Sequence, residues 1–336
     1  MKAIEEKWED RQTVGSGEDD WREETFALPF RIGEVTLFQV PLRVLKWRRH
    51  FLEIAPETSP GPPPRLPTDT CTIAVDTSRP IVSRLSRFSI VDDCLRYVTW
   101  QYSRQYVRLG GDFAAYEAAF HRKTRATLRR KVRKFAGVRE EPDFRVFRSS
   151  GEMIDFWEDA RCISARSFQE RFLGQGLPDS EAFRKEVAAA ADRGDVVGWI
   201  LYSENRPVAY TLGQSVAPGV IQYGHTGYDP EYRALSPGTV LQYLVIRFLF
   251  DEAKFEVYDL CVGEAEHKRL FANEDQLCAD VMFFRKTPLN IVLATAHFGL
   301  AWINEAIIGV LDALHLKQGV KKALRRSGRG SGSTAA

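Results

Sequence analysis

The segment that decides the fold is IQYGHTGYDPEYRALSPGTVLQYLVIRFL, residues 221–249. Residues 220–228 are rich in β-branched and aromatic side chains, so this part predicts a strand. Residues 229–237 contain Asp-Pro and Ser-Pro-Gly, which predict a turning loop. From Gly238 onward, apolar residues recur every three or four positions and predict a helix with one apolar stripe: Val240, Leu241, Leu244, Val245, Phe248 and Leu249.

A strand, a loop of small residues and a helix N-terminus can together bind an anion. The first N–H groups of a helix have no internal partner, and the helix dipole adds partial positive charge there. Ser236 is predicted to cap the helix, with Pro237 at the first helical position, where its missing N–H costs nothing. Gly238 would let a phosphate approach the backbone closely. The same residues also suit an ordinary capped helix, so both interpretations stay open from the segment alone.

The composition is that of a globular protein with one large or two modest domains. The chain has 336 residues, of which 44% are hydrophobic and 27% are charged. A net charge of +2 argues against binding nucleic acid along the whole chain. The five cysteines are odd in number and widely spaced, so we expect no metal site and reduced thiols. The charged N-terminus has no apolar core, so we expect no secretion signal and a cytoplasmic protein.

The order of the predicted elements indicates an α/β (α+β) fold. From Asp195 onward, three antiparallel strands are followed by a helix, a strand, a second helix and a last strand. This order predicts a mixed, mostly antiparallel sheet flanked by helices. We expect five parts along the chain: a mobile N-terminus (1–24), a β-rich N-terminal half (25–135), a main domain (136–286), amphipathic helices (287–326) and a disordered tail (327–336).

A predicted helix over Phe113–Phe135 ends the β-rich half with the basic run HRKTRATLRRKVRK, which holds eight Lys or Arg and no acid. The run can be a solvated helix face, or it can bind a coenzyme phosphate or a polyanionic substrate. Nucleic acid is the least favoured partner because the run contains no interleaved aromatic platform. We hypothesise that Arg125, Arg129 and Arg133, spaced four apart, line one face and bind an anion.

Residues 289–316 are largely apolar but are interrupted by polar residues such as Asn304 and Glu305. A carboxylate near the centre of a spanning helix is costly in lipid, so we predict that the helix packs on the protein and does not cross a membrane. Association with a membrane surface is the alternative, which the basic run at residues 317–326 supports. The predicted packing stripe is Ile291, Ala294, Phe298, Ala301, Trp302, Glu305 and Ile308.

Three segments together resemble the GNAT acyltransferase superfamily. They are YDPEYRALSPGTVL (228–241), YDLCVGEAEHKRLFA (258–272) and YVRLGGDFAAYEAAFHRKTRATLRRKVRKF (106–135). The resemblance covers roughly residues 97–286 and is greatest to the branch that holds FemAB-like and CelD/BcsL-like (cellulose biosynthesis) acetyltransferases. It implies a GNAT-type sheet over residues 136–286, preceded by a degenerate GNAT-like half over residues 25–135.

The resemblance implies an N-acyltransferase that takes its acyl group from acetyl-CoA or another acyl-CoA. The family places the pyrophosphate on backbone N–H groups, here Leu235, Ser236, Gly238, Thr239 and Val240, with Arg233 leading into the loop. The usual family fingerprint runs from Gln or Arg into Gly-x-Gly. Here the sequence is Arg-Ala-Leu-Ser-Pro-Gly, and Pro237 cannot donate a hydrogen bond.

The acceptor that we expect is an amine on a small molecule, a sugar or a cell-envelope or polysaccharide precursor. No metal is needed. Two alternatives stay open. One is a FemAB-like transferase that uses aminoacyl-tRNA, the only case in which nucleic acid is a partner. The other is a non-catalytic GNAT-fold subunit of a polysaccharide synthesis complex.

Acyl transfer to an amine needs a base with a pKa near neutrality and a group that stabilises the departing thiolate. Five candidates follow the strand ends: His225, Asp229, Glu264, His267 and Lys268. The family usually has tyrosine before the lysine, as an acid for the thiolate, and His267 could still donate a proton. Each candidate also has a structural interpretation: a packed strand histidine, a turn residue, a carboxylate near a helix N-terminus, or an exposed helix face.

Overall fold

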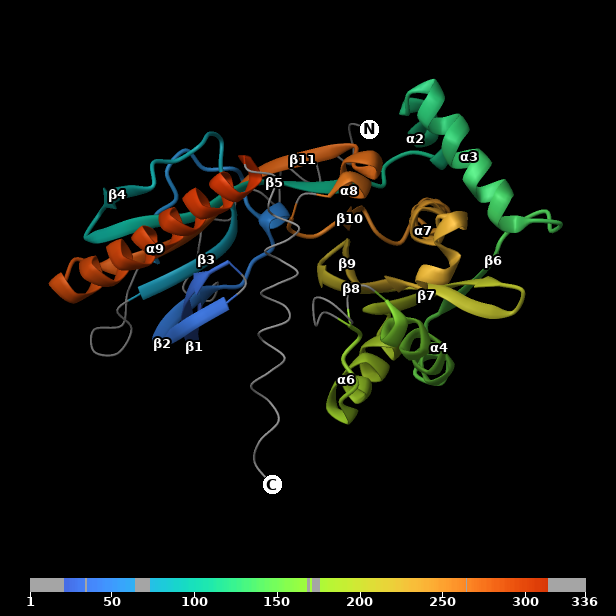
Figure 1. The fold of residues 1–336 in the computed structure, drawn as a ribbon, viewed down its shortest axis with the longest axis horizontal. Helices are drawn as coiled ribbons and strands as arrows, with labels where there is room; N and C mark the ends of the chain where they lie inside the picture. Colours follow the sequence, from blue (N-terminus) through green and yellow to red (C-terminus); the bar gives the residue numbers. More distant parts are fainter. Residues whose placement is uncertain are drawn as a thin grey trace. The chain divides into compact units, whose positions relative to one another are not determined.

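The computed structural model describes residues 21–33, 35–63, 73–167, 170, 176–263 and 265–313. Its contacts divide the chain into two compact units. Among the described residues, unit 1 contains residues 102–277, and unit 2 combines residues 21–101 with residues 278–313. Figure 1 labels the elements of both units. The expectations for residues 1–20 and 314–336 fall outside the described residues, and the division into domains expected from the sequence stays a prediction.

Unit 2 is a sheet with one long helix. Its strands are β1 (Trp21–Ile32), β2 (Val35–Trp47), β3 (Ile73–Pro80), β4 (Phe88–Val91), the first part of β5 (Cys94–Arg108) and the last part of β11 (Glu274–Arg285). The strand order is β1-β2-β3-β11-β5, and β4 pairs with β5. The short 3-10 helix η2 (Phe51–Glu53) follows β2, and α9 (Pro288–Ala313) follows β11. Leu28, Val44, Tyr97 and Phe284 form part of its core.

Unit 1 holds the segment that opened the sequence analysis. Its strands β6 (Asp143–Phe147), β7 (Val196–Ser203), β8 (Arg206–Ala217), β9 (Val220–Tyr228) and β10 (Val257–Asp259) continue in this order to β5. Neighbours are antiparallel except β9 and β10, which are parallel. The helices are α2 (Phe113–Ala119), α3 (Arg122–Ala136), α4 (Glu152–Arg166), α6 (Glu181–Asp192), η3 (Pro230–Leu235), α7 (Pro237–Glu252) and α8 (Glu266–Phe271).

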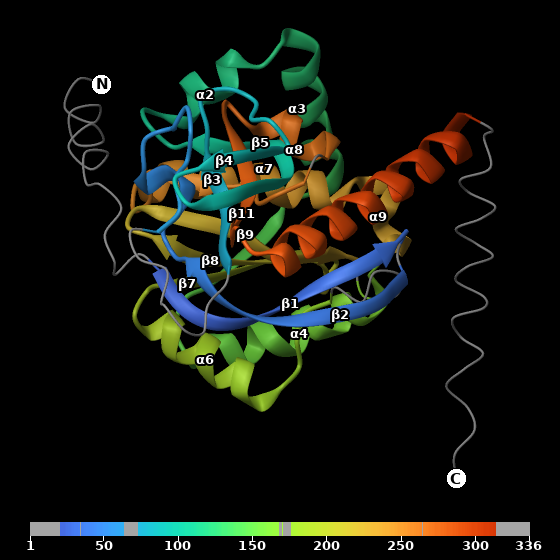
Figure 2. The same cartoon turned by 90° about the vertical axis from the view of Figure 1, so that its left-hand side faces the viewer.

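The side chains of β7 alternate between two apolar cores, as the period of a strand requires. Val197, Trp199 and Leu201 pack with α3 and α7, whereas Ile200 and Tyr202 pack with α4 and α6. Figure 2 shows α4 and α6 on one side of β7 and β8, and α7 on the other. The expected mixed, mostly antiparallel sheet flanked by helices is therefore confirmed.

One predicted helix is two helices. The single helix expected over Phe113–Phe135 breaks at Phe120, whose backbone is extended with ψ 142°. His121 then begins α3, and its ring nitrogen accepts a hydrogen bond from the Lys123 N–H at 3.3 Å. The Phe120 ring packs edge-on against Tyr116 and Phe271, with ring centroids 5.0 and 6.4 Å apart. Sequence periodicity missed the break because both helices are amphipathic and no Gly or Pro separates them.

None of the helices in the described residues is both long and apolar enough to cross a membrane.

Candidate functional site

Strands β9 and β10 pair over only three positions and then separate. Val257, Tyr258 and Asp259 lie opposite Val220, Ile221 and Gln222. Strand β10 ends there, and Cys261 turns the chain away with φ 64°. Strand β9 continues to Tyr228 with no further strand on this edge among the described residues. Its backbone groups on this edge can therefore bind an extended ligand.

A β-bulge lies in the part of β9 beyond the separation. Tyr223 pairs with Gly213 and Thr226 pairs with Thr211, so Gly224 and His225 together lie opposite one residue of β8, Leu212. A bulge leaves one residue out of the ladder and turns its neighbours. A Cβ at Gly224 would lie 2.5 Å from the Leu212 carbonyl oxygen, which explains the glycine.

The bulge also places Tyr223 and His225 on opposite faces of the sheet. Tyr223 packs with the core under α7, and its ring lies 6.1 Å from the ring of His267 in α8, centroid to centroid. The His225 ring instead lies edge-on to Phe183 of α6, with centroids 5.6 Å apart. Without the bulge, residues 223 and 225 would share a face.

The loop before α7 turns through a left-handed residue. Ser236 has φ 56° and ψ 47°, and its side chain makes no capping hydrogen bond, so only its expected position at the helix start is confirmed. Its carbonyl accepts hydrogen bonds from Thr239 N–H at 3.0 Å and Val240 N–H at 3.1 Å, while its own N–H donates to Arg233. Gly238 N–H has no backbone acceptor in the described part of the chain and is exposed. It is thus the open donor at this helix start.

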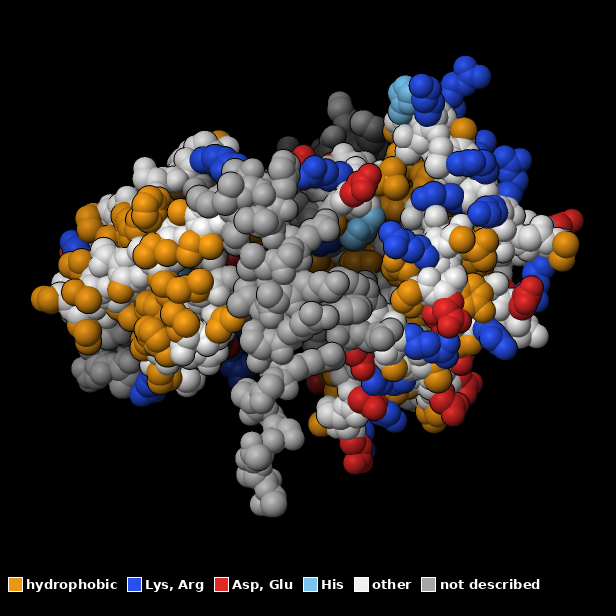
Figure 3. Space-filling view, viewed as in Figure 1, with side chains coloured by type: hydrophobic (Ala, Val, Ile, Leu, Met, Phe, Trp, Pro, Cys, Tyr) orange, Lys and Arg blue, Asp and Glu red, His pale blue; other side chains and the backbone are white. Residues whose placement is uncertain are grey.

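The basic helix α3 lies beside the start of α7. The Lys131 ammonium lies 3.5 Å from the Thr239 hydroxyl, and the Lys134 ammonium donates to the Ala234 carbonyl at 3.0 Å. Leu128 and Phe135 of α3 are buried in the core shared with α7, which fixes this approach. Figure 3 shows Lys and Arg side chains gathered over α3. Two separate sequence signals, the helix start and the basic run, therefore meet at one site.

The three arginines chosen from the spacing do not form this site. Arg129 pairs with the buried carboxylate of Glu117 in α2, and Arg125 donates to the Ala118 carbonyl at 3.4 Å. Arg133 is exposed on α3. The cations that reach this site are Lys131, which contacts Thr239 of α7, and Lys134, which contacts Ala234 of η3.

The polar groups near the separation of β9 and β10 are Tyr223, His267 and Lys268. Burial lowers the pKa of His267, and the positive charge of Lys268 lowers it further. Burial raises the pKa of Tyr223 to about 12. Burial also lowers the pKa of Lys268, whose ammonium donates to the carbonyls of Cys261 and Val262 at 3.2 and 2.8 Å. At neutral pH, His267 is a neutral imidazole and Tyr223 keeps its proton.

A buried ion pair lies at the point where β9 and β10 separate. Arg104 of β5 donates to both oxygens of the Asp259 carboxylate, which is fully buried. The Gln222 side chain and the Cys261 N–H also donate to Asp259, each at 3.0 Å. The carboxylate therefore links β5, β9 and the turn after β10, and its hydrogen bonds offset the cost of burying the charge.

Two of the other expected catalytic residues, Asp229 and His225, have structural partners. Asp229 is buried, caps η3 by accepting from the Glu231 N–H at 3.1 Å, and pairs with Arg166 at 2.7 Å. His225 faces α6, and burial lowers its pKa despite a hydrogen bond with the Gly176 backbone that raises it. Glu264 lies outside the described residues. Of the catalytic candidates that were expected to cluster, the structure thus places His267 and Lys268 together and His225 on the other face of the sheet.

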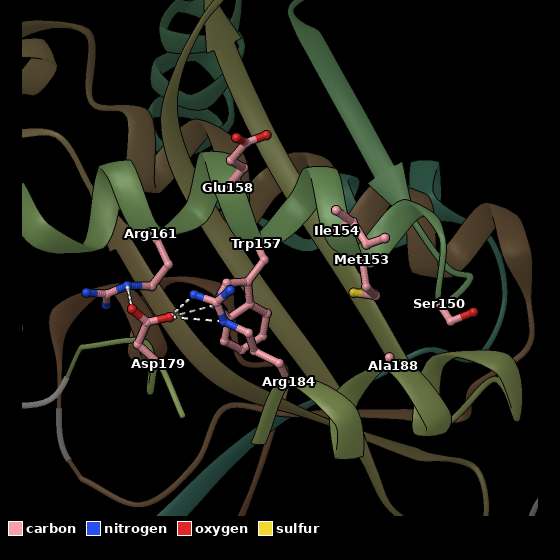
Figure 4. A pocket seen from close by; sticks show the side chains of 9 residues that line it. All are labelled: Ser150, Met153, Ile154, Trp157, Glu158, Arg161, Asp179, Arg184 and Ala188. Carbon is pink, nitrogen blue, oxygen red and sulfur yellow. Dashed lines mark hydrogen bonds and ion pairs between the residues drawn. The ribbon is translucent and has the colours of Figure 1, made fainter. Parts of the chain in front are cut away.

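A pocket of about 430 Å³ lies between α4 and α6. Figure 4 shows Trp157 and Met153 pointing into it from α4 and Arg184 from α6. The Asp179 carboxylate accepts from the Trp157 indole N–H at 3.3 Å and pairs with Arg184 and Arg161. These polar groups satisfy one another, so the pocket offers a ligand mainly its aromatic wall.

The comparisons with known proteins agree with this architecture. Residues 122–269 match the family model described as the acetyltransferase (GNAT) domain. The superfamily expected from the sequence is therefore confirmed over these residues. The comparison with curated proteins gives no match.

Several solved structures are similar to parts of the chain. FemX is 10% identical, with 82% of this chain and 91% of FemX covered and a TM-score of 0.45. L-PGS from Bacillus licheniformis is 15% identical, with 66% and 72% covered and a TM-score of 0.40. A GCN5-related N-acetyltransferase from Kribbella flavida is 14% identical, with 57% and 61% covered and a TM-score of 0.32.

Proposed function

We propose that the protein is an N-acyltransferase that moves an acyl group from an acyl-CoA, acetyl-CoA above all, to an amine. The acceptor class that we propose is a small molecule, a sugar or a cell-envelope or polysaccharide precursor. The observation that carries the proposal is the start of α7, where the exposed Gly238 N–H lies beside two lysines of α3. A pyrophosphate suits these donors because helix dipole and ammonium charges add at one place.

The donor site that we propose keeps Leu235, Ser236, Gly238, Thr239, Val240 and Arg233 from the sequence analysis and adds Lys131 and Lys134. The three N–H groups of Ser236, Thr239 and Val240 already bond to backbone carbonyls, so they contribute chiefly through the helix dipole. Gly238 N–H and the lysines then make the direct contacts. The pantetheine arm of the donor would extend along the open edge of β9 toward Tyr223.

Transfer would proceed by attack of a neutral amine on the thioester carbonyl. A new C–N bond forms, the C–S bond breaks, and the amine proton passes to His267, which is neutral at pH 7 because burial lowers its pKa. The Tyr223 hydroxyl, which keeps its proton, donates a hydrogen bond to the departing thiolate. The thiolate then takes up a proton, and His267 returns its own to solvent.

The test is calorimetric titration of CoA and acetyl-CoA into the wild type and Gly238→Asp. A Cβ at Gly238 would lie 3.6 Å from Tyr228, an ordinary contact, so the variant should fold. A carboxylate beside the phosphates should weaken binding at least tenfold, about 1.4 kcal/mol. Gly110→Asp is the matched control because its Cβ meets nothing within 4 Å. Unchanged affinity in Gly238→Asp would remove the α7 start from the donor site.

A tRNA-dependent transfer is the second candidate, because basic residues of α3 also face solvent: Arg122, Lys123, Arg130 and Arg133. Aminoacyl-tRNA would contact several of these cations at once, so its binding should fall steeply with salt. CoA contacts only the few cations at the α7 start, so its binding should depend less on salt. A wild type that binds aminoacyl-tRNA but no acyl-CoA would favour this candidate. A wild type that binds neither would favour the non-catalytic subunit.

A further inference from the structure

Helix α9 is fixed to unit 2 by one face. Ala294 is fully buried, and the Tyr97 hydroxyl lies 2.9 Å from the His297 ring nitrogen. The Phe298 ring meets Phe88 edge-on, with ring centroids 5.4 Å apart. The Asn304 side chain accepts a hydrogen bond from Gly33 N–H at 2.6 Å, in the turn between β1 and β2. These contacts set which side of α9 faces away from the sheet.

The outward face of α9 is apolar and exposed. Leu289 is 78% exposed, Val292 62% and Trp302 61%, and Ile303 and Ile307 are exposed as well. The predicted packing stripe is therefore wrong at Ile291 and Trp302, which are both exposed. Residues 288–304 contain no Asp, Glu, Lys or Arg. The hydroxyl of Thr295 turns back to the carbonyls of Ile291 and Val292 at 2.7 and 3.1 Å, so it adds little polarity to the face. Figure 3 shows the resulting group of hydrophobic side chains over α9.

The sequence that follows this face is basic. After Asp312 the chain contains no acid, but it contains six cations: Lys317, Lys321, Lys322, Arg325, Arg326 and Arg329. These residues lie beyond the described part of the chain and enter the argument only by their charge. An apolar helix face can insert at the acyl boundary of a membrane, and a polybasic segment that follows it can bind the phosphate headgroups. The two together therefore suit an anionic lipid surface.

We propose that α9 binds the surface of an anionic bilayer, with its outward face in the headgroup region and the basic segment on the lipid phosphates. The outward face is a single row along one helix, with no charged groups over residues 288–304 that a protein partner could pair. An exposed tryptophan at position 302 suits the interface, where its ring is apolar and its N–H stays hydrated. The proposal is independent of the donor and the acceptor of the transfer reaction.

The test is co-sedimentation of the full chain with vesicles of phosphatidylcholine alone and of phosphatidylcholine with about one third phosphatidylglycerol. The wild type should bind the anionic vesicles at least tenfold more tightly than the neutral ones. The double variant Val292→Glu, Ile303→Glu should lose at least tenfold in binding, because two carboxylates then face the acyl boundary. Both positions are exposed, so the melting temperature should not change.

Two further variants sharpen the result. Val82→Glu with Ile154→Glu changes two exposed apolar residues outside α9, one in the loop after β3 and one on α4, and should bind like the wild type. Neutralising Lys321, Lys322, Arg325 and Arg326 to Gln should bring binding to anionic vesicles down to the level of neutral ones. Absence of vesicle binding by the wild type overturns the proposal, as does equal binding by the α9 variant. A dimer that the α9 variant dissociates, without vesicle binding, would assign the face to a second copy.

Discussion

At the residue scale, His225 and His267 of unit 1 differ in the faces they meet. His267 lies near Tyr223 on the α7 side of the sheet, and His225 lies against Phe183 on the α6 side. Burial lowers the pKa of both. Of the two, His267 is the one that lies near Tyr223, where β9 and β10 separate, so it is the residue that we expect to take the amine proton.

The corresponding prediction concerns the pH profile of transfer. Wild-type kcat/KM should rise with pH as His267 loses its proton, with a midpoint below the ordinary histidine value of 6.5, and then level off. His267→Ala should lower kcat by about 10²–10⁴-fold and remove this acidic limb. Thiol release measured from pH 5 to 8 tests both statements.

His225→Ala is the companion variant, since it removes another histidine of the same unit whose pKa is lowered by desolvation. We expect it to keep the acidic limb. If the limb disappears in His225→Ala and persists in His267→Ala, the roles assigned to the two residues are reversed.

The residues that sequence reasoning missed show which information a pattern lacks. A strand alternates strictly, so the sequence places Tyr223 and His225 on one face, and only the bulge at Gly224 separates them. A glycine within a strand is the one local signal of such a bulge. The helical spacing of α3 likewise shows that its cations form rows but not which row meets α7. That choice depends on the buried residues Leu128 and Phe135.

At the element scale, we expect the bulge of β9 to be disturbed when one methyl group is added at Gly224. In Gly224→Ala the new Cβ would lie 2.5 Å from the Leu212 carbonyl oxygen, and backbone must shift to relieve the overlap. We expect a loss of about 1–3 kcal/mol in unfolding free energy and a fall in kcat/KM, because Tyr223 moves with the strand. Gly110→Ala, which meets nothing within 4 Å, is the control. A fully active and stable Gly224→Ala would mean that the bulge is not needed.

Helices α2, α3 and α7 are joined by one buried carboxylate. Glu117 of α2 accepts hydrogen bonds from Arg129 of α3 and, at 2.7 Å, from the Tyr243 hydroxyl of α7. The bond from Arg129 and then the bond from Tyr243 hold the pKa of Glu117 below its ordinary value despite burial. This link determines where α3 lies on α7, and therefore where Lys131 and Lys134 lie.

Glu117→Ala should lower the unfolding free energy by about 1–3 kcal/mol, because it leaves the Tyr243 hydroxyl without its acceptor. Donor affinity should fall as well, since α3 is released from α7. Tyr243→Phe should cost less, and a double-mutant cycle with denaturant melts gives the coupling energy. Additive effects of the two changes would show that the two groups do not act together.

Element boundaries in the second half followed closely from the sequence. The first of the strands expected from Asp195 onward is β7, and the strand expected at residues 220–228 and the helix expected after Ser236 are present as β9 and α7. They were predictable because turns rich in Gly, Asn and Pro bound them and their apolar periods are regular. The break at Phe120 and the shortness of β10 depend on tertiary packing, which no local period contains.

At the scale of the whole molecule, the chain does not divide into consecutive halves. The last part of strand β11 and helix α9 come last among the described residues but complete unit 2, whose other described residues are 21–101. In that unit β11 lies antiparallel to β3, with Cys278 opposite Pro80 and Phe284 opposite Ile73. Such long-range strand pairing cannot be derived from periodicity. The period shows that a strand has an apolar face, but it does not show which other strand pairs with it.

The histidines of both units make the folded chain sensitive to mild acid. Burial is the largest cause that lowers the pKa of His225, His267 and His297 from the ordinary value of 6.5. The unfolded chain therefore binds more protons than the folded chain once the pH falls below about 6.5. The neutral histidines therefore contribute fully to the unfolding free energy above that pH. Their contribution declines as the pH falls toward the lowered pKa values of the folded chain.

Carboxylates contribute in a separate range. Hydrogen bonds from arginines lower the pKa of Glu117, Asp143 and Glu170, whose ordinary values are 4.5, 3.8 and 4.5. Their stabilisation is present above the ordinary values and is lost only as the pH falls through the lowered folded-state values. A decline in stability between pH 6.5 and 5 would therefore be caused by protonation of the histidines.

The prediction is that the melting temperature is flat from pH 8 to about 6.5 and falls from there to pH 5. Changing His225, His267 and His297 to Gln should flatten this range, although the loss of the bond between His297 and Tyr97 lowers the whole curve. The variant should still lose stability when the pH falls below the ordinary pKa values of the carboxylates. Calorimetry in low-salt buffers gives both curves. A wild-type melting temperature that stays constant down to pH 5 would show that the three histidines gain protons as readily in the folded chain as in the unfolded one.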